Sequence, residues 1–77
     1  MVAPAVLSLV AEHFGLDKVH EPDHLVDDLG GDDLDVIELV MLLEEKFNIT
    51  INDMEAEDII TVQDVIDCVK EKVPFNV

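Results

Sequence analysis

The side chains of this chain that could do chemistry are three histidines, one cysteine, one serine and 19 carboxylates. Of the histidines His13, His20 and His24, the last two have the four-residue spacing that places two metal ligands on one helical face, but Pro22 between them disfavours a helix. No nucleophile lies beside a base, and neither a phosphate-binding glycine loop nor an aromatic stacking platform is present. The sequence therefore predicts neither a zinc site nor an enzymatic activity.

Four acids near a double glycine, Asp27, Asp28, Asp32 and Asp35, have the oxygen ligands that Ca²⁺ and Mg²⁺ prefer. The twelve-residue calcium loop of the EF-hand is absent, because its alternation of oxygen ligands around a central glycine is missing. We expect at most weak binding of divalent ions at this surface and no built metal site. An acidic divalent-ion binder is thus the weakest of three hypotheses for the function.

The charge balance restricts the partners. Nineteen acids against four lysines give a formal net charge of −15, while 49% hydrophobic residues still favour a folded chain. Such a charge repels nucleic acid and anionic lipid surfaces, and it favours partners with basic patches. We expect a monomer that binds no nucleic acid and does not insert into membranes.

The compartment follows from cysteine usage and from the absence of a targeting pattern. A single cysteine, Cys68, cannot form an internal disulfide, and the sequence shows neither a leader nor an apolar run of about 18 residues. These features favour the cytoplasm, and an organelle reached after removal of a transit peptide stays open.

Four helices are expected, joined by one long loop. Apolar spacing predicts helices over 4–14 and 33–48, with Gly15 ending the first. The segment 16–31 is expected to be an ordered loop, held to the core by Val19, Leu25, Val26 and Leu29. We further predict a short helix over 53–58 capped by Asp53, and a last helix capped by Thr61 and ended near Pro74. The expected fold class is all-α, a small four-helix bundle with a short third helix.

The helix over 33–48 carries two apolar rows. One row should face the core: Val36, Val40, Leu43 and Phe47. The second row, Leu34, Ile37 and Met41, lies among acids and exceeds what one small core needs.

The eight residues 28–35, DLGGDDLD, resemble the attachment motif of acyl carrier proteins, Asp-Leu-Gly-Ala-Asp-Ser-Leu-Asp. The resemblance extends over 6–72 and is closest to carriers of bacterial type II fatty-acid synthesis. In that family the serine bears the 4'-phosphopantetheine arm that holds acyl groups as thioesters. Asp33 occupies its position here, and a carboxylate has no alcohol oxygen from which to build the phosphodiester.

The resemblance implies a fold, a cavity and a set of partners. It implies one acyl-carrier-like domain over 1–77, with an acyl-chain cavity between helices. It also implies that the helix over 33–48 docks on basic patches of fatty-acid synthesis enzymes and of the phosphopantetheinyl transferase. The implied docking residues are Asp32, Leu34, Asp35, Ile37, Glu38, Met41, Glu44, Glu45, Asp53 and Glu57. A solvated acidic face, and an enlarged core or dimer contact for Ile37 and Met41, are the alternatives.

Asp33 in place of the attachment serine leaves two further hypotheses for the function. Ser8, Thr50 and Thr61 are not placed to replace the attachment serine, so we expect no cofactor on this chain and phosphopantetheine only if Asp33 were serine. The first hypothesis is a carrier of fatty-acid or related acyl biosynthesis whose serine was changed to aspartate. The second is a natural, non-carrying interaction or regulatory paralogue that binds the partners of carriers. Asp33 should suit the start of a helix, where a carboxylate can accept bonds from free backbone N–H groups.

Overall fold

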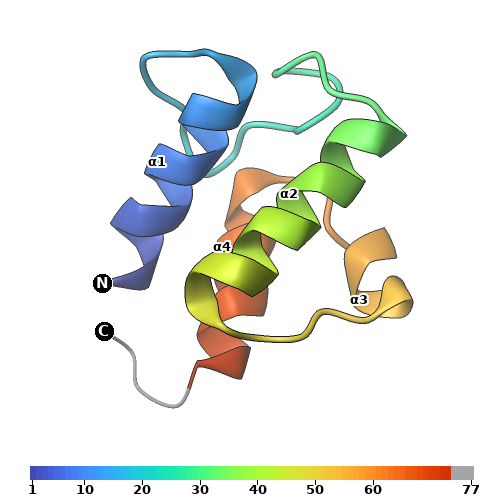
Figure 1. The fold of residues 1–77 in the computed structure, drawn as a ribbon. Helices are drawn as coiled ribbons and strands as arrows, with labels where there is room; N and C mark the ends of the chain where they lie inside the picture. Colours follow the sequence, from blue (N-terminus) through green and yellow to red (C-terminus); the bar gives the residue numbers. More distant parts are fainter. Residues whose placement is uncertain (74–77) are drawn as a thin grey trace.

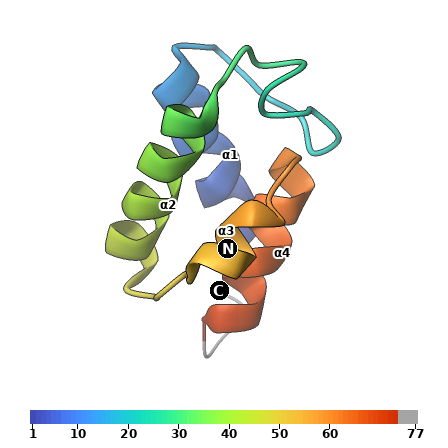
Figure 2. The same ribbon diagram turned by 90° about the vertical axis from the view of Figure 1, so that its right-hand side faces the viewer.

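A computed structural model describes residues 1–73 of the chain and contains four helices, α1 (Val2–Phe14), α2 (Asp33–Phe47), α3 (Asp53–Glu57) and α4 (Val62–Lys72). Helix α1 packs most extensively on α4, and α2 packs on α1 and on the short α3 (Figures 1 and 2). The expected all-α bundle with a short third helix is confirmed. No helix in residues 1–73 is both long and apolar enough to span a bilayer. Pro74, expected to end the last helix, lies outside the described residues.

The ends of α1 differ slightly from the prediction. The helix begins at Val2, two residues before the expected start. Pro4 does not prevent this, because it lies in the first turn, where backbone N–H groups have no helical partner. Gly15 ends the helix as predicted, in the left-handed conformation at φ 68°, and its N–H donates to the carbonyls of Ala11 and Glu12.

Each of the other three helices begins with a capping box, in which two side chains exchange bonds with backbone N–H groups. The pairs are Asp32 with Asp35, Asn52 with Glu55, and Thr61 with Asp64. The prediction for Thr61 is confirmed. The prediction for α3 was wrong by one residue, since Asn52 is the cap and Asp53 is the first helical residue.

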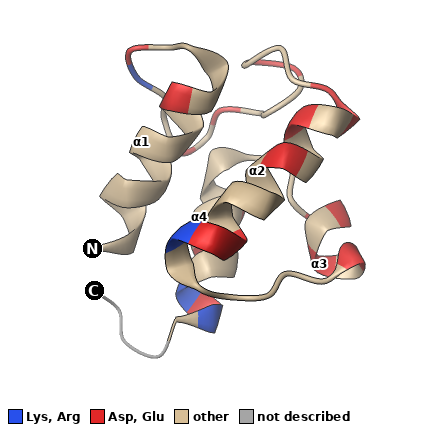
Figure 3. Cartoon of the chain, in the orientation of Figure 1, with Lys and Arg blue, Asp and Glu red and all other residues tan. Residues whose placement is uncertain are grey.

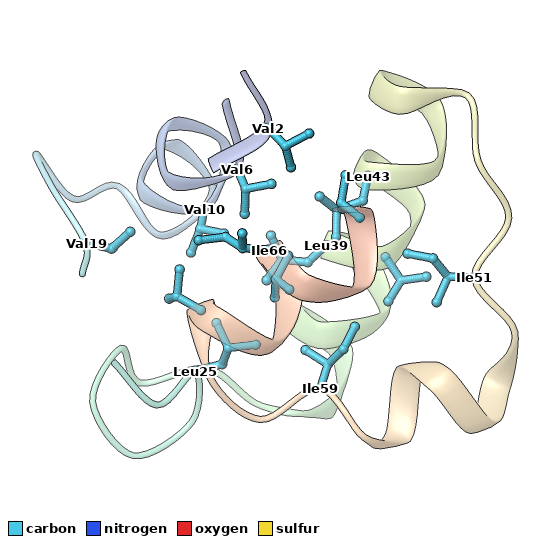
Figure 4. Packing of buried hydrophobic residues seen from close by; sticks show 14 of the residues in the cluster. Val2, Val6, Val10, Val19, Leu25, Leu39, Leu43, Ile51, Ile59 and Ile66 are labelled. Atoms are coloured by element: carbon cyan, nitrogen blue, oxygen red, sulfur yellow. The ribbon is translucent and has the colours of Figure 1, made fainter. Parts of the chain in front are cut away.

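The core is formed by apolar side chains from three helices and the connecting loops (Figure 4). Its largest fully buried side chains are Leu25, Leu39, Leu43, Ile66, Val2, Val6, Val10, Val62, Val65 and Val69. Helix α2 contributes Leu39, Val40 and Leu43, whereas Val36 and Phe47 are only partly buried. All four residues of the predicted row therefore face the core, and the prediction missed only Leu39, which is also buried.

The long loop before α2 is fixed by backbone hydrogen bonds to the start of α4. Leu25 N–H donates to the Ile60 carbonyl over 2.9 Å, and Val62 N–H donates to the Asp23 carbonyl over 3.0 Å. Leu25 is fully buried, as predicted, but Val26 is 43% exposed and does not hold the loop to the core. The loop is thus ordered by its backbone as much as by its apolar side chains.

Candidate functional site

Two glycines, Gly30 and Gly31, form the turn that precedes Asp33 at the start of α2. Gly30 has a φ of +77°, a conformation that costs a residue with a side chain about 1 to 2 kcal/mol. Gly31 donates its N–H to the Leu25 carbonyl over 2.9 Å, and a Cβ at Gly31 would lie 2.9 Å from that same oxygen. The double glycine therefore turns the chain and brings it against Leu25 just before Asp33.

The carboxylate of Asp33 is exposed, and among the described residues it makes no hydrogen bond. The side chain that caps α2 is Asp32, whose Oδ1 accepts from Asp35 N–H over 3.0 Å, while Asp35 Oδ2 accepts from Asp32 N–H over 3.0 Å. The expectation that Asp33 itself accepts these bonds was wrong, because its neighbour already holds the cap. Asp33 still gains the attraction of a carboxylate to a helix amino end, about 0.3 to 1 kcal/mol.

His13 joins α1 to this turn. Its Nε2–H donates to Asp35 Oδ1 over 3.1 Å, and its ring meets that of Phe14 edge-on at 5.0 Å. The hydrogen bond from His13, followed by the one from Asp32 N–H, holds the pKa of Asp35 below its ordinary value of 3.8. Nothing in the local sequence pattern signalled this contact, because the two residues are 22 positions apart.

A cleft of about 710 Å³ opens beside Asp33, between α2 and α3. We call it the α2–α3 cleft. The 24–26 loop, the first turns of α2, helix α3 and the segment after it form its wall: His24, Leu25, Val26, Asp33, Val36, Ile37, Asp53, Ala56, Glu57, Ile59 and Ile60. Figure 2 shows α3 at its position between α2 and α4.

Helix α3 is short and buries none of its residues, so polar contacts at its ends help to hold it. Lys72 Nζ of α4 lies 2.7 Å from Glu55 Oε2, and Asn52 Oδ1 accepts from Glu55 N–H over 2.8 Å. The bond from Lys72, then that from Asn52 N–H, lowers the pKa of Glu55, and the same ion pair raises the pKa of Lys72. One wall of the cleft is thereby fixed to α4.

The second apolar row of α2 is exposed. Leu34, Ile37 and Met41 are 61, 56 and 61% exposed, so none of them enlarges the core. The sequence pattern did not indicate two further exposed apolar side chains, Met54 of α3 at 77% and Ile60 of the cleft wall at 49%, because neither belongs to a periodic row.

The acids predicted to dock are mostly exposed. Figure 3 shows acidic residues in the loop before α2, on α2 and on α3, and basic residues near the ends of α2 and α4. Three of the predicted acids also have structural contacts: Asp32 and Asp35 in the capping box, and Glu44, whose Oε2 accepts from Ile51 N–H over 2.9 Å. The remaining docking acids are exposed, namely Glu38, Glu45, Asp53 and Glu57.

No hydroxyl replaces the missing serine at this site. Ser8 faces a different hollow between α1 and α2, and Thr61 Oγ1 accepts from Asp64 N–H at the start of α4. Neither Ser8, Thr50 nor Thr61 lines the α2–α3 cleft. The residues present therefore do not fit a 4'-phosphopantetheine group, which needs an alcohol oxygen at position 33.

Three of the four acids considered for divalent ions already accept hydrogen bonds from the backbone. Asp28 Oδ2 accepts from His24 N–H over 2.7 Å, and Asp32 and Asp35 form the capping box. Residues 1–73 contain no group of three acids, histidines or cysteines placed to hold a metal ion. Weak surface binding that includes Asp27 stays a prediction.

Comparison with known proteins identifies the family to which this four-helix fold belongs. Residues 4–69 match the family model described as the phosphopantetheine attachment site. A structure from Mycobacterium tuberculosis, provisionally described as an acyl carrier protein, has a TM-score of 0.88 and 32% identity, over 92% of this chain and 97% of that one. The acyl carrier protein of Thermotoga maritima has a TM-score of 0.76 and 37% identity, over 90% of this chain and 82% of that one. The chain therefore belongs to the phosphopantetheine attachment-site family, which includes the acyl carrier proteins, carriers rather than enzymes.

Proposed function

We propose that this chain is an acyl carrier protein of fatty-acid or related acyl biosynthesis whose arm cannot be attached, and that it docks on pathway enzymes through α2. The observation that carries the proposal is Asp33 at the attachment position, on a carrier fold that is otherwise regular. Attachment needs a hydroxyl oxygen that attacks phosphorus, and a carboxylate at this position does not provide one. Without the arm there is no thiol, and without the thiol no thioester forms.

The docking part of the proposal is supported by the surface of α2. Leu34, Ile37 and Met41 are exposed apolar side chains on a helix that also presents Glu38 and Glu45. Apolar centres with a charged rim are typical of protein interfaces, and the net charge of −15 would steer a basic partner toward this face. The basic partners we propose are synthesis enzymes and the phosphopantetheinyl transferase.

A natural, non-carrying interaction protein is the second candidate, and the ease with which Asp33 is accommodated favours it. Asp33 displaces no capping bond, because Asp32 and Asp35 hold the first turn of α2. Its carboxylate also places one negative charge where a phosphodiester would place one. A protein with this surface would compete with loaded carriers for their partners.

Competition for a transferase tests the docking that both candidates share. We expect this chain to slow the modification of an authentic acyl carrier protein by a phosphopantetheinyl transferase, and we expect added salt to weaken the inhibition. The variant Met41→Ser should inhibit less, whereas Ser8→Ala, on another face, should inhibit as the parent chain does. Equal inhibition by both variants, or none by the parent chain, would reject α2 as the docking face.

A further inference from the structure

Asp35 differs from the other acids predicted to dock, because both of its carboxylate oxygens already accept hydrogen bonds. Its Oδ1 accepts from His13 Nε2–H over 3.1 Å, and its Oδ2 accepts from Asp32 N–H over 3.0 Å. None of the other predicted docking acids has both oxygens bonded within residues 1–73. Asp35 is therefore better placed to hold the start of α2 than to meet a partner.

The first turn of α2 lies outside the buried part of the helix. Asp33 and Leu34 are exposed, and the first buried residue of α2 is Leu39. Within residues 1–73, the contact between His13 and Asp35 is the only side-chain hydrogen bond or ion pair that joins α2 to another helix. Because exposed helix ends fray readily, this contact is what fixes the first turn of α2 against α1.

The last two residues of α1 lie on either side of Asp33 along the chain. His13 bonds to Asp35, two residues after Asp33. Phe14 packs on Gly31, two residues before Asp33, where a Cβ would lie 3.0 Å from both Cε1 and Cζ of the ring. The end of α1 therefore contacts the chain before and after Asp33 and leaves Asp33 itself exposed.

We propose that His13 is a positioning residue for docking, which holds Asp33 and Leu34 in the arrangement that a partner enzyme meets without touching the partner itself. This inference rests on the proposed function, because it assigns a role in the docking of α2. The side chain of His13 is 13% exposed, and the hollow that it lines between α1 and α2 shares no lining residue with the α2–α3 cleft beside Asp33. His13 thus acts on Asp33 through Asp35.

The loss of this one bond sets the size of the effect. If the first turn of α2 takes up other arrangements, the affinity for a partner falls in proportion to the fraction of molecules that keep the competent one. One hydrogen bond in a folded protein shifts such an equilibrium by about threefold to tenfold. A variant without the donor should therefore dock more weakly by this factor, whereas a variant that keeps a donor should dock as the parent chain does.

The competition assay with a transferase and an authentic acyl carrier protein tests the proposal with variants of the full chain. His13→Leu keeps a side chain of similar size without a donor, and its inhibition constant should rise about threefold to tenfold. His13→Gln keeps an N–H that can donate, and it should inhibit within about twofold of the parent chain. Inhibition by His13→Gln as weak as that by His13→Leu would overturn the proposal.

A variant destabilised elsewhere separates position from stability. Thr61→Ala removes the hydroxyl that caps α4, far along the chain from the His13 contact, and lowers the stability of the fold. It should nevertheless inhibit as the parent chain does. If Thr61→Ala inhibits as weakly as His13→Leu, stability rather than position sets the affinity and the proposal is wrong.

Amide hydrogen exchange of the free chain, followed by nuclear magnetic resonance, gives a second readout that needs no partner. The N–H groups of Asp35 and Val36 both donate to Asp32 in the first turn of α2. Their exchange should be faster in His13→Leu and unchanged in His13→Gln and Thr61→Ala. Unchanged exchange in His13→Leu would refute the role of His13, even if that variant inhibited more weakly.

The same experiments separate this inference from the function on which it rests. If the parent chain inhibits the transferase and His13→Leu inhibits equally well, the proposed docking stands and the positioning role is wrong. If the parent chain does not inhibit at all, the proposed docking is wrong and the positioning role falls with it, whatever the exchange rates.

Discussion

The imidazole of His13 donates to the carboxylate of Asp35 over 3.1 Å and joins the last turn of α1 to the first turn of α2. The side chain of His13 is 13% exposed and that of Asp35 is 31% exposed, so water reaches the bond only partly. The same carboxylate closes the capping box with Asp32. One side chain therefore fixes both the start of α2 and its attachment to α1, next to Asp33.

This arrangement predicts a loss of stability in acid. The pKa values of Asp35, Glu55 and Asp64 are all lowered by hydrogen bonds made in the folded state. Such groups stabilise the fold above their unfolded pKa, and this contribution is lost as the pH falls through the lower folded pKa. We expect the free energy of unfolding from urea titrations to decline below about pH 4. The variant Asp35→Asn should decline less steeply than the parent, and an identical acid profile would show that this carboxylate contributes nothing.

The cap of α4 can be tested with one pair of variants. Thr61→Ala removes the acceptor for Asp64 N–H and should lower the free energy of unfolding by about 1 kcal/mol. Thr61→Ser retains a hydroxyl and should cost much less. Urea denaturation of both variants checks the prediction, and equal losses would assign the effect to the methyl group of Thr61 rather than to its hydroxyl.

The turn before Asp33 should tolerate no side chain at either glycine. Gly30→Ala places a residue with a Cβ at a φ of +77° and should cost about 1 to 2 kcal/mol. Gly31→Ala brings a Cβ within 2.9 Å of the Leu25 carbonyl oxygen and should cost about 1 to 3 kcal/mol. Thermal unfolding measures both costs, and an unchanged melting temperature for Gly31→Ala would mean that the loop moves freely.

Substitutions on the exposed face of α2 should weaken docking, whereas substitutions on its buried face should lower stability. Ile37 is 56% exposed, so Ile37→Ala should change the free energy of unfolding by no more than about 0.5 kcal/mol while weakening binding to a partner enzyme. Leu43 is fully buried, so Leu43→Ala should cost about 2 to 5 kcal/mol. Surface plasmon resonance with an immobilised transferase, together with urea denaturation, measures both effects. A large loss of stability in Ile37→Ala would place its side chain in the core instead.

Local patterns in the sequence predicted most of the helices. The apolar spacing of α2 and α4, the glycine after α1 and the threonine before α4 act within a few residues, so each could be identified without the fold. The cap of α3 was assigned to Asp53 rather than Asn52, because both residues have capping side chains and their order alone does not select one.

The contacts between distant segments were not predictable in the same way. The burial of Leu39 depends on how α2 is rotated against α1 and α4. The bond between His13 and Asp35 and the pairing of the loop with α4 depend on tertiary geometry that no periodicity encodes. Position 33 itself was identified from the motif, whereas the apolar walls and the acidic charge of the cleft beside it emerge only from the fold.

The central claim is that Asp33 alone prevents this carrier domain from receiving its arm. Intact mass spectrometry after incubation with coenzyme A and a phosphopantetheinyl transferase tests it directly, with the parent chain and Asp33→Ser treated side by side. The account predicts an unchanged mass for the parent and a gain of one phosphopantetheine group for Asp33→Ser. A gain on the parent chain, or no gain on a folded Asp33→Ser variant, would contradict it.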